Sequence, residues 1–502
     1  MPFCGDEMRK IILSFVILCI ISYCIFLQLA SPTFYESDSY YHIAVSRFIK
    51  DLGFHYKFHW AQLSVYKDYF SDSGFLFHLF NVPFLSLSND IVMAGKYAII
   101  FYNILFILVL VFILRKYLPD HLVSCFLLLP FLSATFTTYF LYLRSVSLAN
   151  IFTILGIYFL INKKLAGLLI ISLLYPLTHI SFPTILIFAL VCEIIRYVFH
   201  KEFYFRNVYV AAIGIMVGCF IHPNFPNNFI YLHFLYSTAD YLKKGIDLGL
   251  GSELFSYPTA RVFLENFALF FTINIILWMA FLSRVKISFT TAVWAACANF
   301  YLALAINADR YWYPANALFF IFFAAYTKDW IESKKPAKTA GKINAFIVAY
   351  AVIAVIFLPA SLNSLRANME LNTKMGVHYK KAGLWMKDNI PAGETIYHNY
   401  WSDPDYFICF NPKNDYLVVL DPVNMYYRYP RIFLLYRDLS RGMINKPYEA
   451  LKEVFKVKYG YTRNDNFFYV RIKKSRNQFK ILYEDDLGII FKLLDNSSIP
   501  AH

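Results

Sequence analysis

The chain has 502 residues, of which 59% are hydrophobic and only 16% are charged. Soluble domains carry about 25% charged residues, so this composition excludes an ordinary soluble protein and indicates one embedded in a membrane. The formal net charge of +14 would favour nucleic-acid binding in a soluble protein, but here the basic residues gather in short turns between apolar segments. That distribution follows the positive-inside rule, so the charge indicates membrane topology, and we expect no nucleic-acid partner.

Eleven apolar segments are long enough, or nearly so, to span a bilayer as helices. They lie at about residues 11–30, 91–114, 121–142, 146–162, 165–178, 180–195, 207–222, 263–283, 287–307, 311–327 and 343–360. With the N-terminus inside, the turns on the cytoplasmic side hold the basic clusters Arg115–Lys116, Lys163–Lys164, Arg196–Arg206, Arg284 with Lys286, and Lys328–Lys342. This arrangement satisfies the positive-inside rule, so we predict a polytopic α-helical membrane protein with about 11 transmembrane helices.

Three polar regions then lie on the non-cytoplasmic side. The first loop, residues 31–90, ends in an amphipathic stretch, Gly74–Leu87, that predicts an interfacial or re-entrant helix. The second region is the loop at 223–262, and the third comprises residues 361–502. In the third we expect a helix at Lys380–Asn389, more helices between Arg431 and Lys458, and strands at Thr395–Tyr397, Tyr416–Leu420, Phe467–Ile472, Phe479–Tyr483 and Ile489–Leu493. We therefore predict a transmembrane domain at 1–360, which includes the first external loop, and a small exoplasmic α/β domain at 361–502.

The strongest local signal is an acidic and aromatic run from Glu36 to His42, directly after the first apolar segment. Its two carboxylates, Glu36 and Asp38, stand two residues apart in a loop, where they can bind a hard divalent cation or accept a substrate proton. Asp72, where the loop returns toward the membrane, is a second candidate acid that completes a metal site with Asp38 or acts alone as a base. The alternatives are ordinary solvated acids and, for Asp72, a helix N-cap.

An Asp-x-Tyr-Tyr-His run just after the first transmembrane helix resembles the first external loop of GT-C fold glycosyltransferases, above all the catalytic subunits of oligosaccharyltransferases. The many helices followed by a C-terminal exoplasmic domain agree with this resemblance. It implies that Asp38 is catalytic or metal-binding, with Glu36 and Asp72 assisting. It also implies a sugar donor linked to a polyprenyl phosphate or pyrophosphate. Some branches of this fold use a divalent cation such as Mg or Mn, for which Asp38 and Asp72 are the candidate ligands here, and others use none.

Four further ionisable side chains stand at predicted outer helix ends: Arg144, His179, His222 and Arg310. Such groups are costly at a membrane and therefore favour a functional interpretation. Because a guanidinium can contact phosphate through two hydrogen bonds, we expect this set to bind the phosphate of the donor. The alternatives are an Arg144 that extends to lipid headgroups, an Arg310 paired with its neighbour Asp309, and histidines with structural hydrogen bonds.

In the C-terminal region, Tyr400–Tyr406 is loosely similar to the Trp-Trp-Asp-Tyr-Gly acceptor motif of oligosaccharyltransferases, although the second Trp and the Gly are absent. The resemblance implies acceptor binding, for which the candidate residues are Trp401, Asp403, Asp405 and Tyr406. Aromatic faces beside carboxylates suit a sugar or a peptide. They equally suit the edge of a small α/β core that packs on the membrane domain.

These features together favour a membrane glycosyltransferase that moves a sugar or oligosaccharide from a polyprenyl-phosphate-linked donor to a protein, lipid or glycan acceptor. We expect it in a bacterial inner membrane, with the active site and the C-terminal domain facing the periplasm. The alternative is a transporter or flippase of a lipid-linked or anionic substrate, which would place ionisable residues near the bilayer midplane and show an internal repeat. A non-catalytic assembly subunit of the same fold would share the features described above.

Overall fold

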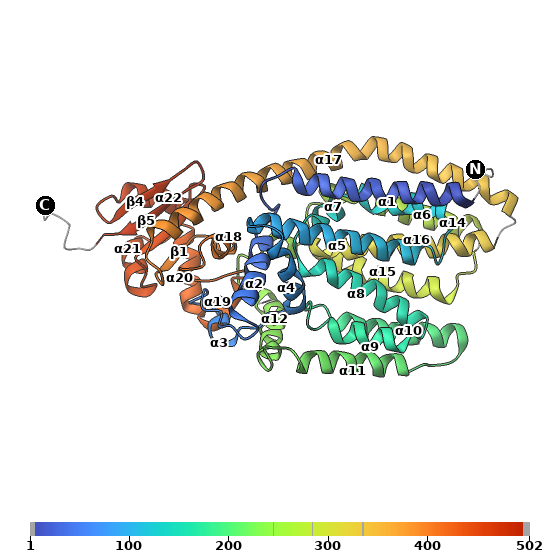
Figure 1. Ribbon diagram of the computed structural model, residues 1–502, viewed down its shortest axis with the longest axis horizontal. Coiled ribbons are helices and arrows are strands. Elements are labelled where there is room, and N and C mark those ends of the chain that lie inside the picture. The colour runs from blue at the N-terminus through green and yellow to red at the C-terminus, as the bar shows by residue number, and fades with distance from the viewer. Residues whose placement is uncertain (1–5, 244, 284, 334–335, 495–502) are drawn as a thin grey trace.

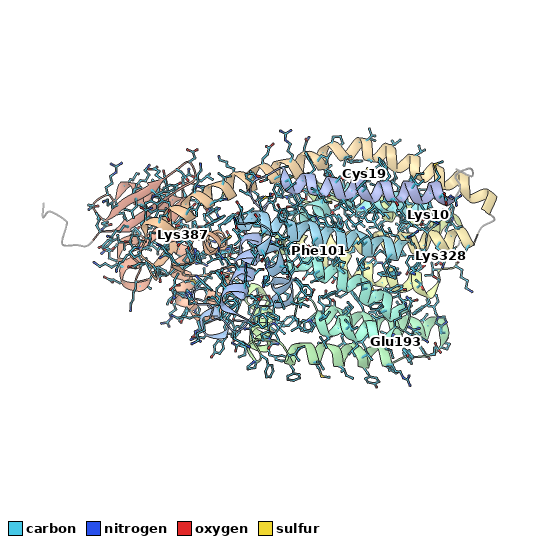
Figure 2. All side chains as sticks on the ribbon, viewed as in Figure 1. Lys10, Cys19, Phe101, Glu193, Lys328 and Lys387 are labelled. Carbon is cyan, nitrogen blue, oxygen red and sulfur yellow. The ribbon has the colours of Figure 1, made fainter. Side chains whose placement is uncertain are left out.

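The computed structural model describes residues 6–243, 245–283, 285–333 and 336–494, so Arg284, Lys334 and Lys335 of the predicted basic turns lie outside it. The molecule is elongated, with a bundle of long helices in one part and a smaller region of strands and short helices in the other (Figure 1). Lys10 and Lys328 lie toward the end of the bundle that is remote from Lys387, which stands beside the strands (Figure 2).

The helical bundle is built from segments that are apolar on every side, as expected for helices that contact lipid or one another. Within the described ranges, five helices are long and apolar enough to cross a membrane, or up to seven if each of two bent pairs counts as one span. The prediction of a mostly helical protein with membrane-spanning segments is therefore confirmed. The predicted count of about 11 spans is not confirmed. The bundle helices are α1 (Asp6–Leu29), α5 (Ile91–Leu114), α6 (Asp120–Leu128), α7 (Ala134–Phe140), α8 (Ser145–Ile161), α9 (Leu165–Leu174), α10 (Pro183–His200), α11 (Arg206–Phe220), α14 (Phe267–Ser283), α15 (Phe289–Asn307) and α16 (Trp312–Glu332).

Two of the predicted spans are bent near right angles. The segment Asp120–Leu132, which ends in the 3₁₀ turn η2 (Leu129–Leu132), meets α7 at 88°, and α13 (Thr259–Glu265) meets the segment after it at 82°. The two breaks bond to each other, since the Ser133 hydroxyl donates to the Glu265 carbonyl at 2.9 Å and to Asn266 Oδ1 at 3.0 Å. Backbone groups that a helix break leaves without partners must find others inside a membrane protein, and these side chains supply them.

The first loop folds into helices that pack beneath the C-terminal region. It contains α2 (Asp38–Leu52), α3 (Tyr66–Tyr69), α4 (Phe75–Asn81) and the 3₁₀ turn η1 (Val82–Ser86). Helix α2 buries an apolar face against a helix of the C-terminal region, α18 (Asp403–Phe410), so the acidic run predicted as a loop instead opens a helix. The predicted Gly74–Leu87 segment is helical as α4 and η1. At the other end of the loop, buried Lys96 donates to the Gln28 carbonyl at 2.5 Å and thereby caps α1.

The second polar loop contains α12 (Asn227–Lys243) and the 3₁₀ turn η3 (Ser252–Leu254), and it ends at α13. A further 3₁₀ turn, η4 (Asp309–Tyr311), joins α15 to α16. The two turns contact one another through the Asp309 amide, which donates to the Phe255 carbonyl at 3.2 Å. This contact brings the second loop to the ends of the bundle helices.

Helix α17 (Pro336–Asn389) joins the bundle to a five-stranded sheet (Figure 1). The helix passes residue 360 without a break, and the predicted division into 1–360 and 361–502 stays a prediction. The sheet has the order β2-β1-β3-β5-β4; its first three strands are parallel and the pairs β3–β5 and β5–β4 are antiparallel. The elements are β1 (Thr395–His398), α18 (Asp403–Phe410), β2 (Asp415–Tyr416), α19 (Val423–Arg428), α20 (Pro430–Ser440), α21 (Pro447–Glu449), the π-helical turn η5 (Ala450–Val454), β3 (Tyr459–Arg463), α22 (Phe467–Lys474), β4 (Phe479–Glu484) and β5 (Gly488–Leu493).

Two strand predictions need correction. The segment Phe467–Ile472 is helix α22, because the Asn466 side chain accepts a hydrogen bond from the Tyr469 amide and Phe468 and Ile472, four residues apart, form its buried face. The central strand β3 was not predicted. The predicted strand at Tyr416–Leu420 pairs within the sheet only at its first residue.

The first loop extends the edge of this sheet. The amides of Gln62 and Leu63 donate to the carbonyls of Tyr416 and Leu417 at 2.8 and 2.7 Å, and the Tyr416 amide donates to the Trp60 carbonyl at 2.7 Å. A continuous backbone ladder therefore joins the first loop to the C-terminal region. These two parts of the chain, more than 300 residues apart in sequence, lie side by side, with the first loop between the helical bundle and the sheet (Figure 1).

Candidate active site

A nearly buried arginine, Arg144, lies at the centre of a cluster of carboxylates from the first and second loops. Its guanidinium contacts Glu36, Asp38 and Glu253; the closest approach to Asp38 is 2.8 Å and to Glu253 is 2.6 Å. Only 15% of the Arg144 side chain is exposed. One cation therefore holds three carboxylates from two loops, where water screens their charges poorly.

Local sequence explains how the first loop presents its two acids. Asp38 is the first residue of α2, where the helix dipole favours a negative charge. Glu36 stands just before the helix, and the Ser39 hydroxyl donates to its Oε1 at 2.9 Å. Ser39 in turn accepts from the Leu143 amide at 3.0 Å, which ties the start of α2 to the residue before Arg144. The acids and the arginine thus belong to one hydrogen-bonded unit.

The second loop contributes Glu253, which is not among the site residues predicted from the sequence. Turn η3 carries this residue between two arginines, with Oε1 3.7 Å from Nη2 of Arg310 and Oε2 at Arg144. Burial acts to raise the pKa of Glu253, but Arg144 and Arg310 hold it below its ordinary value, so the carboxylate is charged. One indirect sequence signal for Glu253 was the presence of Arg144 and Arg310 at outer helix ends, because two arginines there require a nearby negative charge.

Burial changes the protonation of other acids in the cluster. It raises the pKa of Glu36 to about 8, although the Arg144 guanidinium acts against this, and it raises the pKa of Asp421 to about 6. Burial, with the charge of Asp38, also raises the pKa of Asp405 well above its ordinary value. One Asp405 oxygen accepts from the Leu420 amide at 3.1 Å, and the other has no partner among the described residues. The cluster therefore mixes ionised and protonated carboxyl groups near neutral pH.

Of the predicted phosphate-binding residues, the structure brings together Arg144, Arg310 and His179. The first two share Glu253, and burial with the charges of Arg310 and Arg144 lowers the pKa of His179 to about 3. His222 lies elsewhere: its Nε2 donates to the Asp72 carbonyl at 3.0 Å and its Nδ1 accepts from the Asn224 amide at 3.1 Å. Both ring nitrogens of His222 therefore brace the backbone of the two loops.

Asp72 contacts His78, and the pair Asp38 and Asp72 does not fit a shared metal site. Both Asp72 oxygens lie within 2.8 Å of His78 Nδ1, and Oδ1 also accepts from the Gly74 amide. The Asp38 carboxylate is turned to Arg144 instead. In the part of the chain that the structure describes, no three His, Cys, Asp or Glu side chains are grouped as a cation would require. A divalent cation is thus not confirmed.

The predicted acceptor residues have three different surroundings. Trp401 Nε1 donates to the Gly249 carbonyl at 2.7 Å, so this ring holds the second loop. Asp403 is fully buried and paired with Arg463 at 2.8 Å, and Tyr406 stacks on Tyr379 with ring centroids 4.1 Å apart. Only Asp405 borders the carboxylate cluster. Asp403 therefore joins α18 to β3, and Tyr406 joins it to α17.

The sequence matches no family model and no curated protein, but solved structures share its fold. ArnT from Cupriavidus metallidurans bound to undecaprenyl phosphate matches with a TM-score of 0.58 and 11% identity, over 97% of this chain and 99% of that one. The oligosaccharyltransferase AglB from Archaeoglobus fulgidus, in complex with an inhibitory peptide and a dolichol-phosphate, gives 0.57 and 12%, over 91% and 69%. The arabinofuranosyltransferase AftD from Mycobacteria gives 0.52 and 12%, over 99% and 40%.

These matches confirm the predicted distant resemblance to GT-C membrane glycosyltransferases. At 10–12% identity the shared feature is the fold alone. What this chain does must be argued from its own residues.

Proposed function

We propose that this protein is a membrane glycosyltransferase that moves a sugar or oligosaccharide from a polyprenyl-phosphate-linked donor to an acceptor on the non-cytoplasmic face. The observation that carries the proposal is Arg144, a nearly buried guanidinium that shares a carboxylate with a second arginine, Arg310. Paired guanidiniums suit a phosphate through charge-assisted hydrogen bonds. Two proteins of the same fold, ArnT and AglB, were solved with undecaprenyl phosphate and with a dolichol-phosphate.

In this proposal each part of the cluster has a chemical task. Arg144 and Arg310 bind the donor phosphate and stabilise the charge that develops on it as the sugar departs, which is usually the largest single contribution to catalysis. Asp38, at the start of α2, orients the attacking group of the acceptor, and Glu36 holds Arg144 in place. On the acceptor side the proposal assigns Asp405, whose carboxyl group interacts with Asp38, and Trp401, which holds the second loop through its hydrogen bond to Gly249. The acceptor itself is a protein, lipid or glycan.

The topology belongs to the same proposal. About 11 spans in a bacterial inner membrane, with the cluster and residues 361–502 facing the periplasm, account for the basic turns of the sequence. The transporter alternative requires ionisable groups near the bilayer midplane. The cluster around Arg144 instead lies where two polar loops meet the C-terminal region, which favours a transferase.

Binding of undecaprenyl phosphate to the protein in lipid nanodiscs tests the phosphate site. Arg144→Gln and Arg310→Gln each remove a charged hydrogen bond of about 1.5–3 kcal/mol, so we expect affinity to fall roughly 10- to 150-fold. Arg144→Lys keeps the positive charge but cannot make a bidentate contact with phosphate, so it should give an intermediate loss of affinity. Arg366→Gln is the matched control, because Arg366 is exposed on α17 and pairs with Glu370 on the same helix. Unchanged affinity in both glutamine variants would contradict the proposal.

Transfer itself is tested with undecaprenyl-phosphate-linked radiolabelled hexoses and pentoses and with membrane extracts as the source of acceptor. Asp38→Asn should abolish incorporation of label while binding of undecaprenyl phosphate persists, because the substitution removes the acid that orients the acceptor, whereas Arg144 keeps its contacts with Glu36 and Glu253. Full transfer by Asp38→Asn would refute the role of this acid.

A further inference from the structure

Three side chains of the first loop form a continuous hydrogen-bonded chain that the phosphate site does not use. The Asp72 carboxylate lies 2.7 and 2.8 Å from Nδ1 of His78, and Nε2 of His78 lies 2.6 Å from Nδ1 of His42. Asp72 is 3% exposed and His78 is 1% exposed, whereas His42 is half-buried. The chain thus runs from a buried carboxylate to a partly accessible imidazole.

The proton positions in this chain follow from what each atom can donate. An ionised carboxylate only accepts, so Nδ1 of His78 carries the proton of that bond. A neutral imidazole has one N–H, and Nε2 of His78 therefore accepts from Nδ1 of His42. The second nitrogen of His42, Nε2, then keeps a free lone pair. No hydrogen bond to that atom is found within the described residues.

His42 lies one turn of α2 after Asp38, the residue proposed to orient the acceptor. Asp38 and His42 are four residues apart on α2 and so share one face of the helix. Burial, together with the neighbouring His78, Arg144 and His179, lowers the pKa of His42 well below its ordinary value. His78 lies on α4, Arg144 at the start of α8 and His179 in the loop before α10. His42 is therefore a neutral base under ordinary conditions.

We propose that His42 is the general base of the transfer and that Asp72 and His78 are positioning residues that fix its tautomer. This inference rests on the proposed function. With a hydroxyl acceptor, the O–H bond breaks and its proton moves to Nε2 of His42 while the oxygen lone pair forms a bond to the anomeric carbon of the sugar. The bond between that carbon and the phosphate oxygen breaks, and its electron pair leaves with the polyprenyl phosphate. The imidazolium later returns the proton to water.

The other candidate bases of the cluster are already engaged. Asp38 and Glu253 are ion-paired with Arg144, so their carboxylates are already engaged. Burial raises the pKa of Glu36 to about 8, so this acid is mostly protonated near neutral pH and already holds its proton. His42, by contrast, is uncharged at the pH of the cell, so the lone pair on its Nε2 is available to take a proton. General-base catalysis contributes typically about 10²- to 10⁴-fold to a reaction. The arrangement has the logic of a Ser-His-Asp triad, in which a carboxylate orients the imidazole that takes the proton.

Asp72→Asn is the decisive variant. The new amide can donate to Nδ1 of His78, and the proton of His78 then moves to its Nε2. His78 Nε2 now donates to Nδ1 of His42, so the proton of His42 moves to its own Nε2. That nitrogen then lacks the lone pair that a base needs. Nitrogen NMR of ¹⁵N-histidine-labelled protein in proteoliposomes reports these tautomers without any substrate. Signals are assigned with His42→Gln and His78→Gln. We expect wild-type His42 to be protonated on Nδ1 and the Asp72→Asn protein to show the exchanged tautomer.

Transfer and binding are then measured on the same protein. Asp72→Asn and His42→Gln should slow transfer from the undecaprenyl-phosphate-linked sugar about 10²- to 10⁴-fold while the Kd for undecaprenyl phosphate changes less than about threefold. The transfer rate of the wild-type protein should fall as the pH is lowered, because His42 gains a proton. The His42→Gln variant should not show this acidic fall in its pH–rate profile. The control is Asp485→Asn, which makes the same change at the His378–Asp485 pair beside the sheet, 2.6 Å apart, and should leave the transfer rate unchanged.

The possible failures are distinguishable. A wild-type His42 protonated on Nε2 overturns the tautomer assignment, and normal transfer by Asp72→Asn or His42→Gln overturns the role of the base. In both cases the proposed function stands if the arginine variants still lose undecaprenyl phosphate binding. If wild-type protein fails to bind undecaprenyl phosphate, the proposed function fails, and the base assignment fails with it.

Discussion

Glu253 contacts both arginines of the proposed phosphate site, so the substitution Glu253→Gln is expected to tighten the binding of a polyprenyl phosphate. The Glu253 side chain lies 2.6 Å from Arg144 and 3.7 Å from Arg310. A phosphate that uses both guanidiniums must first displace this carboxylate. Because an amide has no net charge, the side chain introduced by Glu253→Gln would compete less strongly for the two arginines.

The size of the effect follows from the two contacts. A hydrogen bond between charged groups contributes about 1.5–3 kcal/mol, and the longer contact to the partly exposed Arg310 adds about 0–1 kcal/mol. Glu253 is 26% exposed, so solvent screening and the residual bond of the amide reduce the difference. A net gain of about 1–2 kcal/mol corresponds to roughly 5- to 30-fold tighter binding.

Isothermal titration of nanodisc-embedded protein with undecaprenyl phosphate measures this change. Since the arginines hold the pKa of Glu253 below its ordinary value, the carboxylate stays charged from pH 6 to 8 and the gain should persist across that range. Asp247→Asn is the matched control, because this acid lies on the same loop and pairs with Arg441 at 2.6 Å, away from the cluster. Equal or weaker binding by Glu253→Gln would refute the competition between carboxylate and phosphate.

Three further predictions concern stability. Lys96→Met leaves the Gln28 carbonyl at the end of α1 without its buried donor and should cost about 1–3 kcal/mol, seen as a lower Tm in detergent; an unchanged Tm would contradict the capping role of Lys96. Arg463→Met leaves the buried carboxylate of Asp403 without its cation and should lower the stability of the C-terminal region by about 3–5 kcal/mol. Proteolysis of that region measures the loss, and binding of undecaprenyl phosphate should be retained. Full protease resistance would contradict this role of the ion pair. Folding raises the pKa of Asp421 from 3.8 to about 6, so the folded state binds more protons and its stability falls as pH rises through this window. Asp421→Asn should therefore raise Tm at pH 7.5 and lose that advantage near pH 4; a pH-independent difference would exclude this linkage.

Much of the architecture was accessible from composition and local pattern. Apolar segments long enough to span a bilayer indicate membrane helices whatever their partners are, because hydrocarbon leaves the backbone few other structures. Charge in the short turns predicts topology for the same local reason. The acidic run at Glu36 and Asp38 drew attention because of its place after the first helix, and the structure joins it to Arg144.

Local pattern failed to predict a helix and a pair of bends. Phe467–Ile472 has strand-forming residues, yet the cap at Asn466 and burial at i and i+4 make it a helix. The spans at 121–142 and 263–283 are apolar throughout, and only the bonds between Ser133 and the Glu265 region show why both can bend. The cap that makes Phe467–Ile472 a helix is the adjacent residue, whereas the bond that joins the two bent spans links residues 132 positions apart.

The sequence by itself determined that this is a helical membrane protein whose candidate acids follow the first helix, because hydropathy and charge act locally on each segment. Tertiary structure alone decided which charges meet. It placed Glu253 between two arginines, directed Asp72 to His78 instead of Asp38, and buried Asp403 against Arg463. The physical reason is that charges interact through space at a few ångströms, whereas the residues concerned stand as much as 217 positions apart, between Glu36 and Glu253.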